Sequence, residues 1–218
     1  YTAHNDEYFF KNTFFDKILT FRMLSIVDKV ISISKTVKTF LIDNYRISPR
    51  KILVIKYGFK KEFYTLKKTN KKELSYINKK NIYIGTVARL VSQKRIDLLI
   101  EAFSRIDHKS QNNFKLVIIG DGILKKELID FSKNKKVFKK IIWIKYTEDV
   151  ISHIEKWDLF CLTSKYEGFG LVLLEAIYAG TPILAMQSSS IKEIIGPCGE
   201  VVNFGDLNVK NLKGAFKG

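Results

Sequence analysis

The sequence E-G-F-G-L-V-L-L-E, residues 167–175, decides the fold assignment. It follows an apolar, strand-like segment at 157–163 and leads into a helix that we expect to end near Gly180. The order strand, glycine loop, helix and strand is typical of open α/β sheets, which bind ligands at the carboxyl ends of their parallel strands. Glycine lets backbone amides approach a ligand closely, and the N-terminus of a helix attracts anions. Two acids frame the loop, because Glu167 lies in it and Glu175 lies about two helical turns later.

The composition is that of a folded and strongly basic chain. Of its 218 residues, 46% are hydrophobic, which permits a sizeable core and argues against wholesale disorder. The formal net charge of +16 rests mainly on lysines that are spread along the whole chain. A solvated, lysine-rich surface accounts for this charge, and so does attraction to an anionic membrane surface. Nucleic-acid binding is the least favoured of the three, since the sequence has no zinc, helix-turn-helix or RNA-recognition signature.

The cysteines and apolar runs indicate a reducing environment. Two cysteines, Cys161 and Cys198, are too few for a disulfide framework, and we expect Cys161 to be a small buried hydrophobe in its strand. Nothing indicates a metal site, and we expect no cofactor. These features fit a cytoplasmic protein, either free or peripheral at the inner face of the membrane, and no apolar run reaches the length of a membrane span. The chain begins at Tyr1, and we expect it to be a fragment that lacks its N-terminal part.

Residues 1–58 predict part of a first α/β domain. The expected elements are a strand before His4, a helix over 8–23, a buried strand over 27–34, a helix after it and a strand over 51–55. We expect Ser34 to cap the second helix, in which apolar residues recur at helical spacing. Residues 59–80 are rich in lysine and have no clear apolar period, so we expect a linker between two domains.

Residues 81–218 predict a second, larger α/β domain. Strands are expected at 82–87, 114–119, 141–144, 157–163, 183–186 and 201–202, with helices between them. One of these helices is marked by apolar residues at helical spacing over 96–103. Repeated β-α alternation predicts a parallel sheet with helices on both faces.

Four motifs occur in this larger domain in an order and spacing that identify a family. They are G-T-V-A-R-L with Q-K at 85–94, V-I-I-G-D-G at 117–122, S-x-x-E-G-F-G to E at 164–175, and A-G-T-P at 179–182. Together they resemble the nucleotide-sugar-binding half of GT-B glycosyltransferases of family 4, the retaining group 1 enzymes. The resemblance covers most of residues 81–204. It extends more loosely to 1–58, which would be part of the acceptor-side Rossmann-like domain, with the linker acting as a hinge.

The resemblance implies a role for each charged residue of the motifs. Enzymes of this fold generally work without a bound metal, so cationic side chains take up the charge of the diphosphate leaving group. Arg89 and Lys94 would do this. Glu175 would accept hydrogen bonds from the ribose hydroxyls, and Glu167 would contact the donor sugar near the reacting carbon. The alternative, that these residues are surface charges or acids favoured by a helix dipole, stays open.

The glycine loop has implied roles as well. The amides of Gly168, Phe169 and Gly170 would support the sugar and phosphate. Leu171 would flank the nucleotide, although packing beneath the loop explains it equally well.

The chain has three histidines. His4 resembles the acceptor-domain histidine that faces the donor sugar, and a purely structural role is its alternative. We expect His108 and His153 to lie near helix ends or loops, in contact with solvent. Asp121, in the second motif, is expected to form a turn rather than to take part in catalysis.

Three positions depart from the family pattern. Arg95 follows Lys94 where a glycine is usual, K-Y-G at 56–58 replaces Pro-Asn-Gly, and S-S-S at 188–190 replaces glycines. These departures bear on loop geometry and on sugar specificity.

The leading hypothesis is a retaining, metal-independent hexosyltransferase of polysaccharide or lipopolysaccharide biosynthesis. It would move a sugar from a UDP-, GDP- or ADP-sugar to a cell-envelope glycan or lipid-linked acceptor, with peripheral contact to an anionic membrane and no nucleic acid. A non-catalytic nucleotide-sugar-binding protein is the first alternative. A basic nucleic-acid-binding module is the second.

Overall fold

The computed structural model describes residues 2–3, 21–24, 26–58, 73–106, 113–188 and 190–203. The chain forms two compact units. The smaller comprises Tyr1–Phe59, Tyr166–Gly170 and Ser188–Ile194, and the larger comprises Lys60–Lys165, Leu171–Gln187 and Ile195–Gly218. Most of the predicted linker lies outside the described residues, so the boundaries at 58 and 81 stay predictions. In the described part of the chain, no helix has the length and apolar character needed to cross a bilayer.

The smaller unit contains a parallel sheet in the order β1-β2-β3, whose strands are Thr2–Ala3, Val30–Ser32 and Ile52–Val54. Helix α2, Lys35–Tyr45, begins after Ser34, whose Oγ accepts a hydrogen bond from the Val37 amide at 3.0 Å. Val37, Leu41 and Tyr45 bury one face of α2, as the apolar spacing predicted. The hydrogen bond from the Val37 amide confirms the predicted cap at Ser34. Residues 21–24 are helical. The rest of the helix predicted over 8–23, residues 8–20, lies outside the described residues.

The end of α2 offers a test of backbone strain. Arg46 follows the helix in the left-handed conformation, with φ 49° and ψ 34°, and its amide donates to the Ile42 carbonyl. A β-carbon makes this conformation unfavourable by about 1–2 kcal/mol, and the greater freedom of glycine in the unfolded chain offsets about 0.4–1 kcal/mol of the gain. We therefore expect Arg46→Gly to raise the free energy of unfolding by about 0.5–1 kcal/mol in urea titrations. Thr39→Gly, at an exposed position inside α2, should lower it, and a destabilised Arg46→Gly variant would contradict the strain.

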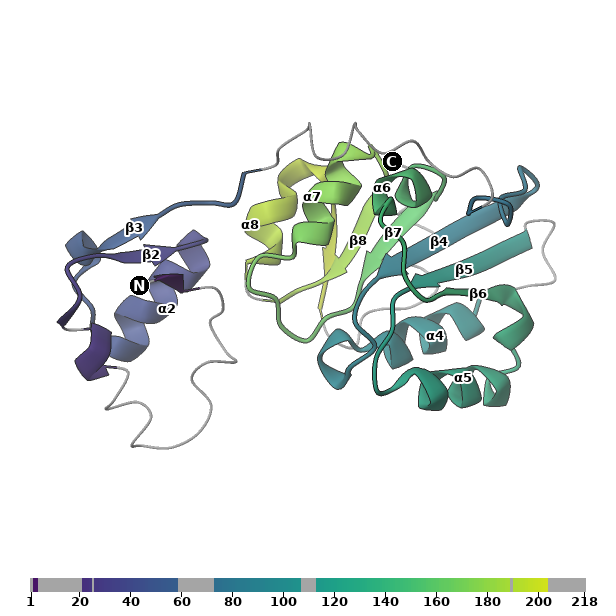
Figure 1. Cartoon of the computed structure of the whole chain (residues 1–218), viewed down its shortest axis with the longest axis horizontal. Helices are drawn as coiled ribbons and strands as arrows, with labels where there is room; N and C mark the ends of the chain where they lie inside the picture. The colour runs from purple at the N-terminus through teal and green to yellow at the C-terminus, as the bar shows by residue number, and fades with distance from the viewer. Residues whose placement is uncertain are drawn as a thin grey trace. The chain divides into compact units, whose positions relative to one another are not determined.

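The larger unit is built on a fully parallel sheet in the order β6-β5-β4-β7-β8-β9 (Figure 1). The strands are β4 Asn81–Val87, β5 Asn113–Ile119, β6 Ile141–Ile144, β7 Leu159–Leu162, β8 Ile183–Met186 and β9 Gly199–Val202. Every strand predicted from residue 81 onward is present. The predicted parallel α/β architecture is confirmed, because each neighbouring pair of strands runs in parallel.

Helices cover both faces of this sheet. Helices α4, Ile96–Ser104, and α5, Lys125–Asn134, lie on one face, while α6, Val150–Ile154, and α7, Leu171–Tyr178, lie on the other (Figure 1). Right-handed crossovers require this change of face, because the chain first moves from β4 to β5 and β6 and then returns to β7 on the far side of β4. The remaining helices are α8 Ile191–Ile195 and the 3-10 helices η1 Pro49–Lys51, η2 Ser92–Lys94, η3 Phe138–Lys140 and η4 Gly196–Cys198.

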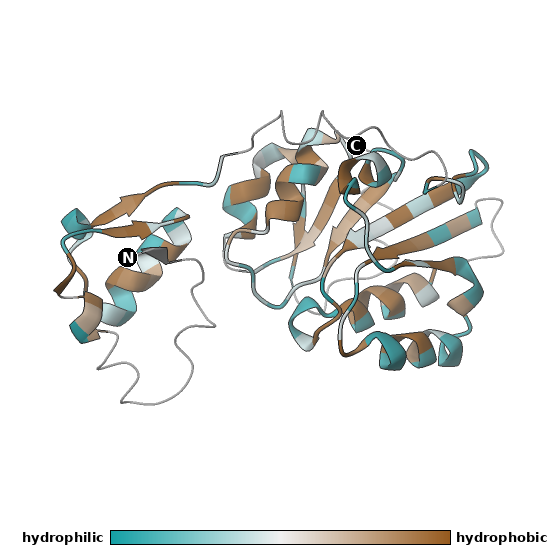
Figure 2. Ribbon diagram, in the orientation of Figure 1, coloured by the Kyte–Doolittle hydropathy of each residue, from teal (hydrophilic) through white to brown (hydrophobic). Residues whose placement is uncertain are grey.

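The core of the larger unit lies between the sheet and its helices. All residues of β7 and β8 are buried, as expected for central strands covered on both faces. Figure 2 shows the apolar strands β7 and β8 and the hydrophilic stretches of α5. Cys161, within β7, is fully buried, and burial raises the pKa of its thiol. The prediction of a small buried hydrophobe at this position is confirmed.

His153 is buried completely, so the expectation that it is solvated was wrong. Its Nδ1 lies 2.9 Å from the Tyr76 hydroxyl, and the two rings stack with their centroids 5.7 Å apart. Trp157 Nε1 donates to the same hydroxyl at 3.1 Å. Neighbouring residues in the sequence could not reveal this burial, because Tyr76 covers the histidine from 77 positions away.

His153 should make stability depend on pH. Burial lowers its pKa below the ordinary value of 6.5, against the opposing charges of Glu73 and Asp149. The unfolded chain therefore takes up this proton before the folded chain does. Stability should be full above about pH 6.5 and should fall as the pH drops below it. Thermal unfolding between pH 8 and pH 5 tests this, and the loss should be smaller in His153→Gln. Equal losses in the two proteins would contradict the assignment.

Candidate functional site

The motifs meet where the order of the strands reverses. Strands β4 and β7 are neighbours, with Ile84 opposite Leu159 and Gly85 opposite Phe160, and they are not consecutive in the chain. Their carboxyl ends lie at the same edge of the sheet, which is where open α/β sheets bind ligands. The two loops that leave this point carry the predicted site residues.

The first loop continues β4 and stays paired with the end of β5. The Ala88 amide donates to the Ile119 carbonyl at 3.0 Å, and the Leu90 amide donates to the Asp121 carbonyl at 2.9 Å. Arg89 lies between these two anchored residues, and its side chain is exposed. Within the part of the chain that the structure describes, its guanidinium takes part in no hydrogen bond or ion pair. An anchored backbone thus presents an exposed cation to solvent.

The second motif, V-I-I-G-D-G, supplies the glycines that this pairing needs. Gly120 has φ +147°, and a β-carbon there would lie 1.9 Å from the Ala88 carbonyl oxygen. A β-carbon on Gly122 would lie 2.5 Å from the Leu90 carbonyl oxygen. Asp121 lies between them and forms the expected turn, because its carboxylate accepts a hydrogen bond from the Gly122 amide at 3.0 Å. That bond lowers the pKa of Asp121.

Lys94 ends the 3-10 helix η2 and is half-buried. The next residue, Arg95, has φ 47° and ψ 43°, which is the left-handed conformation that glycine adopts most easily. The structure thus gives a reason for the glycine that is usual at this position of the family pattern. Arg95 holds the conformation while its guanidinium pairs with Asp97 at 3.0 Å.

The second loop begins after β7 and contacts the first directly. Thr163 donates from its Oγ1 to the Lys94 carbonyl at 2.9 Å, and the Lys165 amide donates to the Gln93 carbonyl at 2.8 Å. Both Thr163 and Ser164 are buried. Thr163 was not among the predicted site residues. The available signal was a hydroxyl directly after a fully buried strand.

Helix α7 follows the second loop. Leu173 and Ala176 are buried under it and fix its orientation on the sheet, while Glu175 is half-buried. Leu171, the first residue of α7, is 55% exposed. The roles predicted for Leu171 and Glu175 stay predictions.

The segment Tyr166–Gly170 belongs to the smaller unit. Glu167 and Phe169 are both buried there. The Ser190 hydroxyl donates to the Gly168 carbonyl at 2.8 Å, and the Tyr57 and Phe169 rings form a T-shaped pair with their centroids 5.1 Å apart. Two of the departures from the family pattern, K-Y-G at 56–58 and S-S-S at 188–190, therefore supply contacts to the glycine loop. The predicted roles of Glu167 and of Gly168, Phe169 and Gly170 stay predictions.

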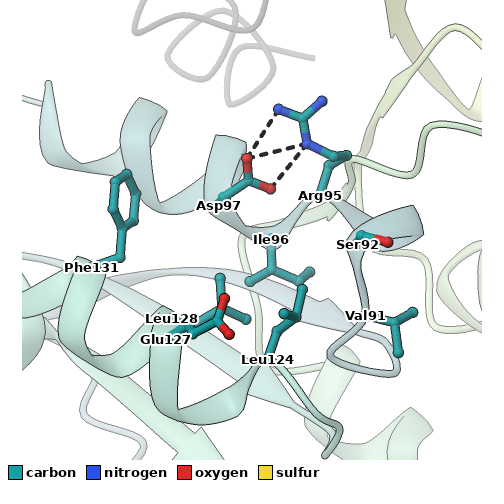
Figure 3. Close-up of a pocket in the computed structure, with 9 residues that line it drawn as sticks. All are labelled: Val91, Ser92, Arg95, Ile96, Asp97, Leu124, Glu127, Leu128 and Phe131. Atoms are coloured by element: carbon teal, nitrogen blue, oxygen red, sulfur yellow. Dashed lines mark hydrogen bonds and ion pairs between the residues drawn. The ribbon is translucent and has the colours of Figure 1, made fainter.

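A pocket of about 470 Å³ lies between the first loop, α4 and α5 (Figure 3). Its apolar wall comes from α4 and α5, and the Arg95–Asp97 ion pair lies at its rim. Val91, Ser92 and Arg95 line it from the loop that carries Lys94.

Two further predictions concern a histidine and a metal. His4 lies outside the described residues, so its role stays a prediction. Among the described side chains, no group of three or more His, Cys, Asp or Glu residues could hold a metal ion. The predicted independence of metal stays untested.

Comparison with known proteins identifies the family. The family described as glycosyl transferases group 1 has a sequence model that matches residues 67–213. The chain belongs to this family. Its matched region contains all four motifs and both loops of the site.

Two relatives of this chain come from a bacterium and an archaeon. One is an N-acetylgalactosamine-N,N'-diacetylbacillosaminyl-diphospho-undecaprenol 4-alpha-N-acetylgalactosaminyltransferase of Campylobacter jejuni, 27% identical over 85% of this chain and 48% of the relative. Another is the uncharacterized glycosyltransferase MJ1178 of Methanocaldococcus jannaschii, 31% identical over 85% of this chain and 49% of the relative. This chain therefore spans about half the length of the curated relatives it matches.

Solved structures share the fold of the chain. Anabaena Alr3699/HepE in complex with UDP has a TM-score of 0.82 at 21% identity, covering 100% of this chain and 61% of HepE. WaaG, a glycosyltransferase involved in lipopolysaccharide biosynthesis, has a TM-score of 0.74 at 20% identity, covering 87% of this chain and 54% of WaaG. The predicted GT-B-type fold is confirmed.

Proposed function

We propose that this protein is a retaining, metal-independent glycosyltransferase that moves a sugar from a nucleotide sugar to a cell-envelope glycan or lipid-linked acceptor. The observation that carries the proposal is the contact of Thr163 and Lys165 with the loop of Lys94. This contact joins two family motifs at the edge of the sheet where α/β proteins bind their ligands.

The donor end rests on two cations. Breaking the bond between the anomeric carbon and the diphosphate leaves negative charge on the phosphate oxygens. Arg89 offers a planar fork of donors and Lys94 a compact charge, and both suit phosphate. Their backbones are held by hydrogen bonds, so little reorganisation is needed when the charge develops.

The acids and the glycine loop complete the donor site in this proposal. Glu175 accepts hydrogen bonds from the ribose hydroxyls, and Glu167 contacts the donor sugar and stabilises positive charge at its anomeric carbon. The amides of Gly168, Phe169 and Gly170 support the sugar and phosphate, and Leu171 flanks the nucleotide. The acceptor attacks on the face from which the diphosphate leaves, with His4 across the donor sugar.

The names of relatives support the class of acceptor. The Campylobacter relative is named for a diphospho-undecaprenol substrate, and Escherichia coli WclY, 30% identical over 59% of this chain, is named for O-antigen biosynthesis. A lipid-linked acceptor lies at a membrane surface. The net charge of +16 favours contact with anionic lipids there.

Donor binding and turnover test the proposal together. The protein is titrated with UDP-, GDP- and ADP-glucose and with the matching N-acetylglucosamine donors, and both thermal stability and nucleotide release are measured. One base should stabilise the protein, by about 2.7 kcal/mol at a hundred times the dissociation constant. No stabilisation and no release with any donor would contradict the proposal. Binding without turnover would favour the non-catalytic alternative.

Glu167→Gln separates binding of the nucleotide from turnover. We expect this variant to bind the nucleotide while its turnover falls by about 100-fold, because an amide carries no charge to stabilise the reacting carbon. Unchanged turnover would contradict the role of Glu167.

Salt-dependent binding to DNA or RNA, without affinity for nucleotide sugars, would instead favour the nucleic-acid alternative.

A further inference from the structure

We infer that Thr163 is a positioning residue that fixes Lys94 for binding the donor diphosphate. This inference rests on the proposed function. Thr163 touches no reacting atom in this account, and it acts only through the peptide that follows Lys94.

The bond from Thr163 is well placed to hold the loop. Thr163 follows β7 directly, is buried, and donates from its hydroxyl to the Lys94 carbonyl at 2.9 Å. A β-branched side chain has little freedom about its first torsion, so the hydroxyl starts from a restricted set of positions. The Lys165 amide anchors the preceding carbonyl, that of Gln93, at 2.8 Å. Two successive peptides of the first loop are thus fixed from the second loop.

The conformation of the next residue shows why an anchor is needed here. Arg95 is left-handed although it is not glycine, and such a conformation persists only where the surroundings enforce it. The Lys94 carbonyl belongs to the peptide that joins Lys94 to Arg95. Thr163 therefore holds one end of the strained residue.

The loop of Lys94 is anchored by Thr163, which follows β7, and the same loop also borders the pocket. Val91, Ser92 and Arg95 line the pocket between α4 and α5 (Figure 3). Atoms that face open space lose packing contacts on that side. If the Thr163 hydroxyl is removed, the loop can move toward the pocket and carry Lys94 with it.

Affinity for the nucleotide measures the effect of the hydroxyl. The probes are UDP, GDP and ADP, and the one that the parent protein binds is used in isothermal titration with Thr163→Val and Thr163→Ser. Valine keeps the shape of threonine and removes the donor, so binding should weaken by about five- to tenfold. Serine keeps the donor and should stay within about twofold of the parent.

A double-mutant cycle with Lys94→Ala distinguishes positioning from a general structural effect. If Thr163 acts through Lys94, Thr163→Val should change affinity by less than about twofold when Lys94 is already alanine. Thr181→Val is the matched control. It removes a buried threonine hydroxyl that donates to the Ile154 carbonyl at 2.8 Å, away from Lys94, and it should leave affinity unchanged.

Hydrogen exchange gives a second readout that needs no ligand. The amides of residues 91–96 should exchange faster in Thr163→Val than in Thr163→Ser or Thr181→Val. Additive losses of affinity in the cycle, or equal exchange in the three variants, would overturn the positioning role and leave the proposed function standing. Failure of the parent protein to bind any of the three nucleotides would overturn both.

Discussion

Replacing Lys94 with alanine is expected to lower kcat/KM for the nucleotide sugar by about 10²–10³-fold. The side chain supplies a positive charge from a half-buried position on a loop whose Val91, Gln93 and Lys94 carbonyls all accept hydrogen bonds. Such a preorganised charge interacts most strongly with the diphosphate as its bond to the sugar breaks, so kcat should fall more than affinity. Initial rates of nucleotide release over a range of donor concentrations measure both quantities.

Lys139→Ala is the matched control for this variant. Lys139 is an exposed lysine of η3, before β6 and therefore at the amino end of the sheet. The two variants change the net charge equally, so general attraction between the basic protein and the anionic donor cancels in the comparison. Lys139→Ala should retain parental kinetics. Equal kinetics in Lys94→Ala and Lys139→Ala would contradict diphosphate binding by Lys94.

Gly120→Ala is expected to lower the free energy of unfolding by about 3 kcal/mol or more. The new β-carbon would lie 1.9 Å from the Ala88 carbonyl oxygen, and the obstacle is backbone rather than a flexible side chain. The backbone of Gly120 also has φ +147°, which an alanine rarely adopts. Relief requires the segment after β4 to move away from β5, and Arg89 moves with it. Urea unfolding measures the loss.

Gly180→Ala separates the clash from the strain. Gly180 has φ +69°, and a β-carbon there would meet nothing within 4 Å. Only the conformational penalty applies, so we expect a loss of about 1 kcal/mol. A loss in Gly120→Ala that is no larger than the loss in Gly180→Ala would show that the pairing of the first loop with the end of β5 does not need the glycine.

The sequence predicted the larger unit well because its signals are local. Runs such as V-I-I at 117–119 are apolar on both faces, and turn residues separate each strand from the next helix. Right-handed crossovers then restrict how the strands can be ordered. The caps and helix faces followed from the same local signals, as Ser34 and α2 show.

Contacts between distant segments could not be predicted in the same way. The burial of His153 depends on Tyr76, and the position of the Lys94 carbonyl depends on Thr163, which is 69 positions away. A histidine or a threonine has the same local pattern whether its partner is water or a buried group. The error on His153 and the omission of Thr163 have this common cause.

The departures from the family pattern acquired a structural meaning. Arg95 adopts the left-handed backbone of the glycine it replaces, and Tyr57 and Ser190 each contact the glycine loop within the smaller unit. Sequence could show that these residues differ from the pattern. It could not show that two of the differences meet on one loop, because the three segments are far apart in the chain.

The proposed function requires a nucleotide sugar to bind at the loops after β4 and β7. Hydrogen exchange of the protein with and without its donor tests this most directly, because it reports each segment of the backbone in one measurement. We expect slower exchange over residues 88–94 and 163–171, and unchanged exchange over 133–140 at the C-terminal end of α5 and in η3. Protection confined to other segments, or none at a saturating concentration of a bound donor, would contradict it.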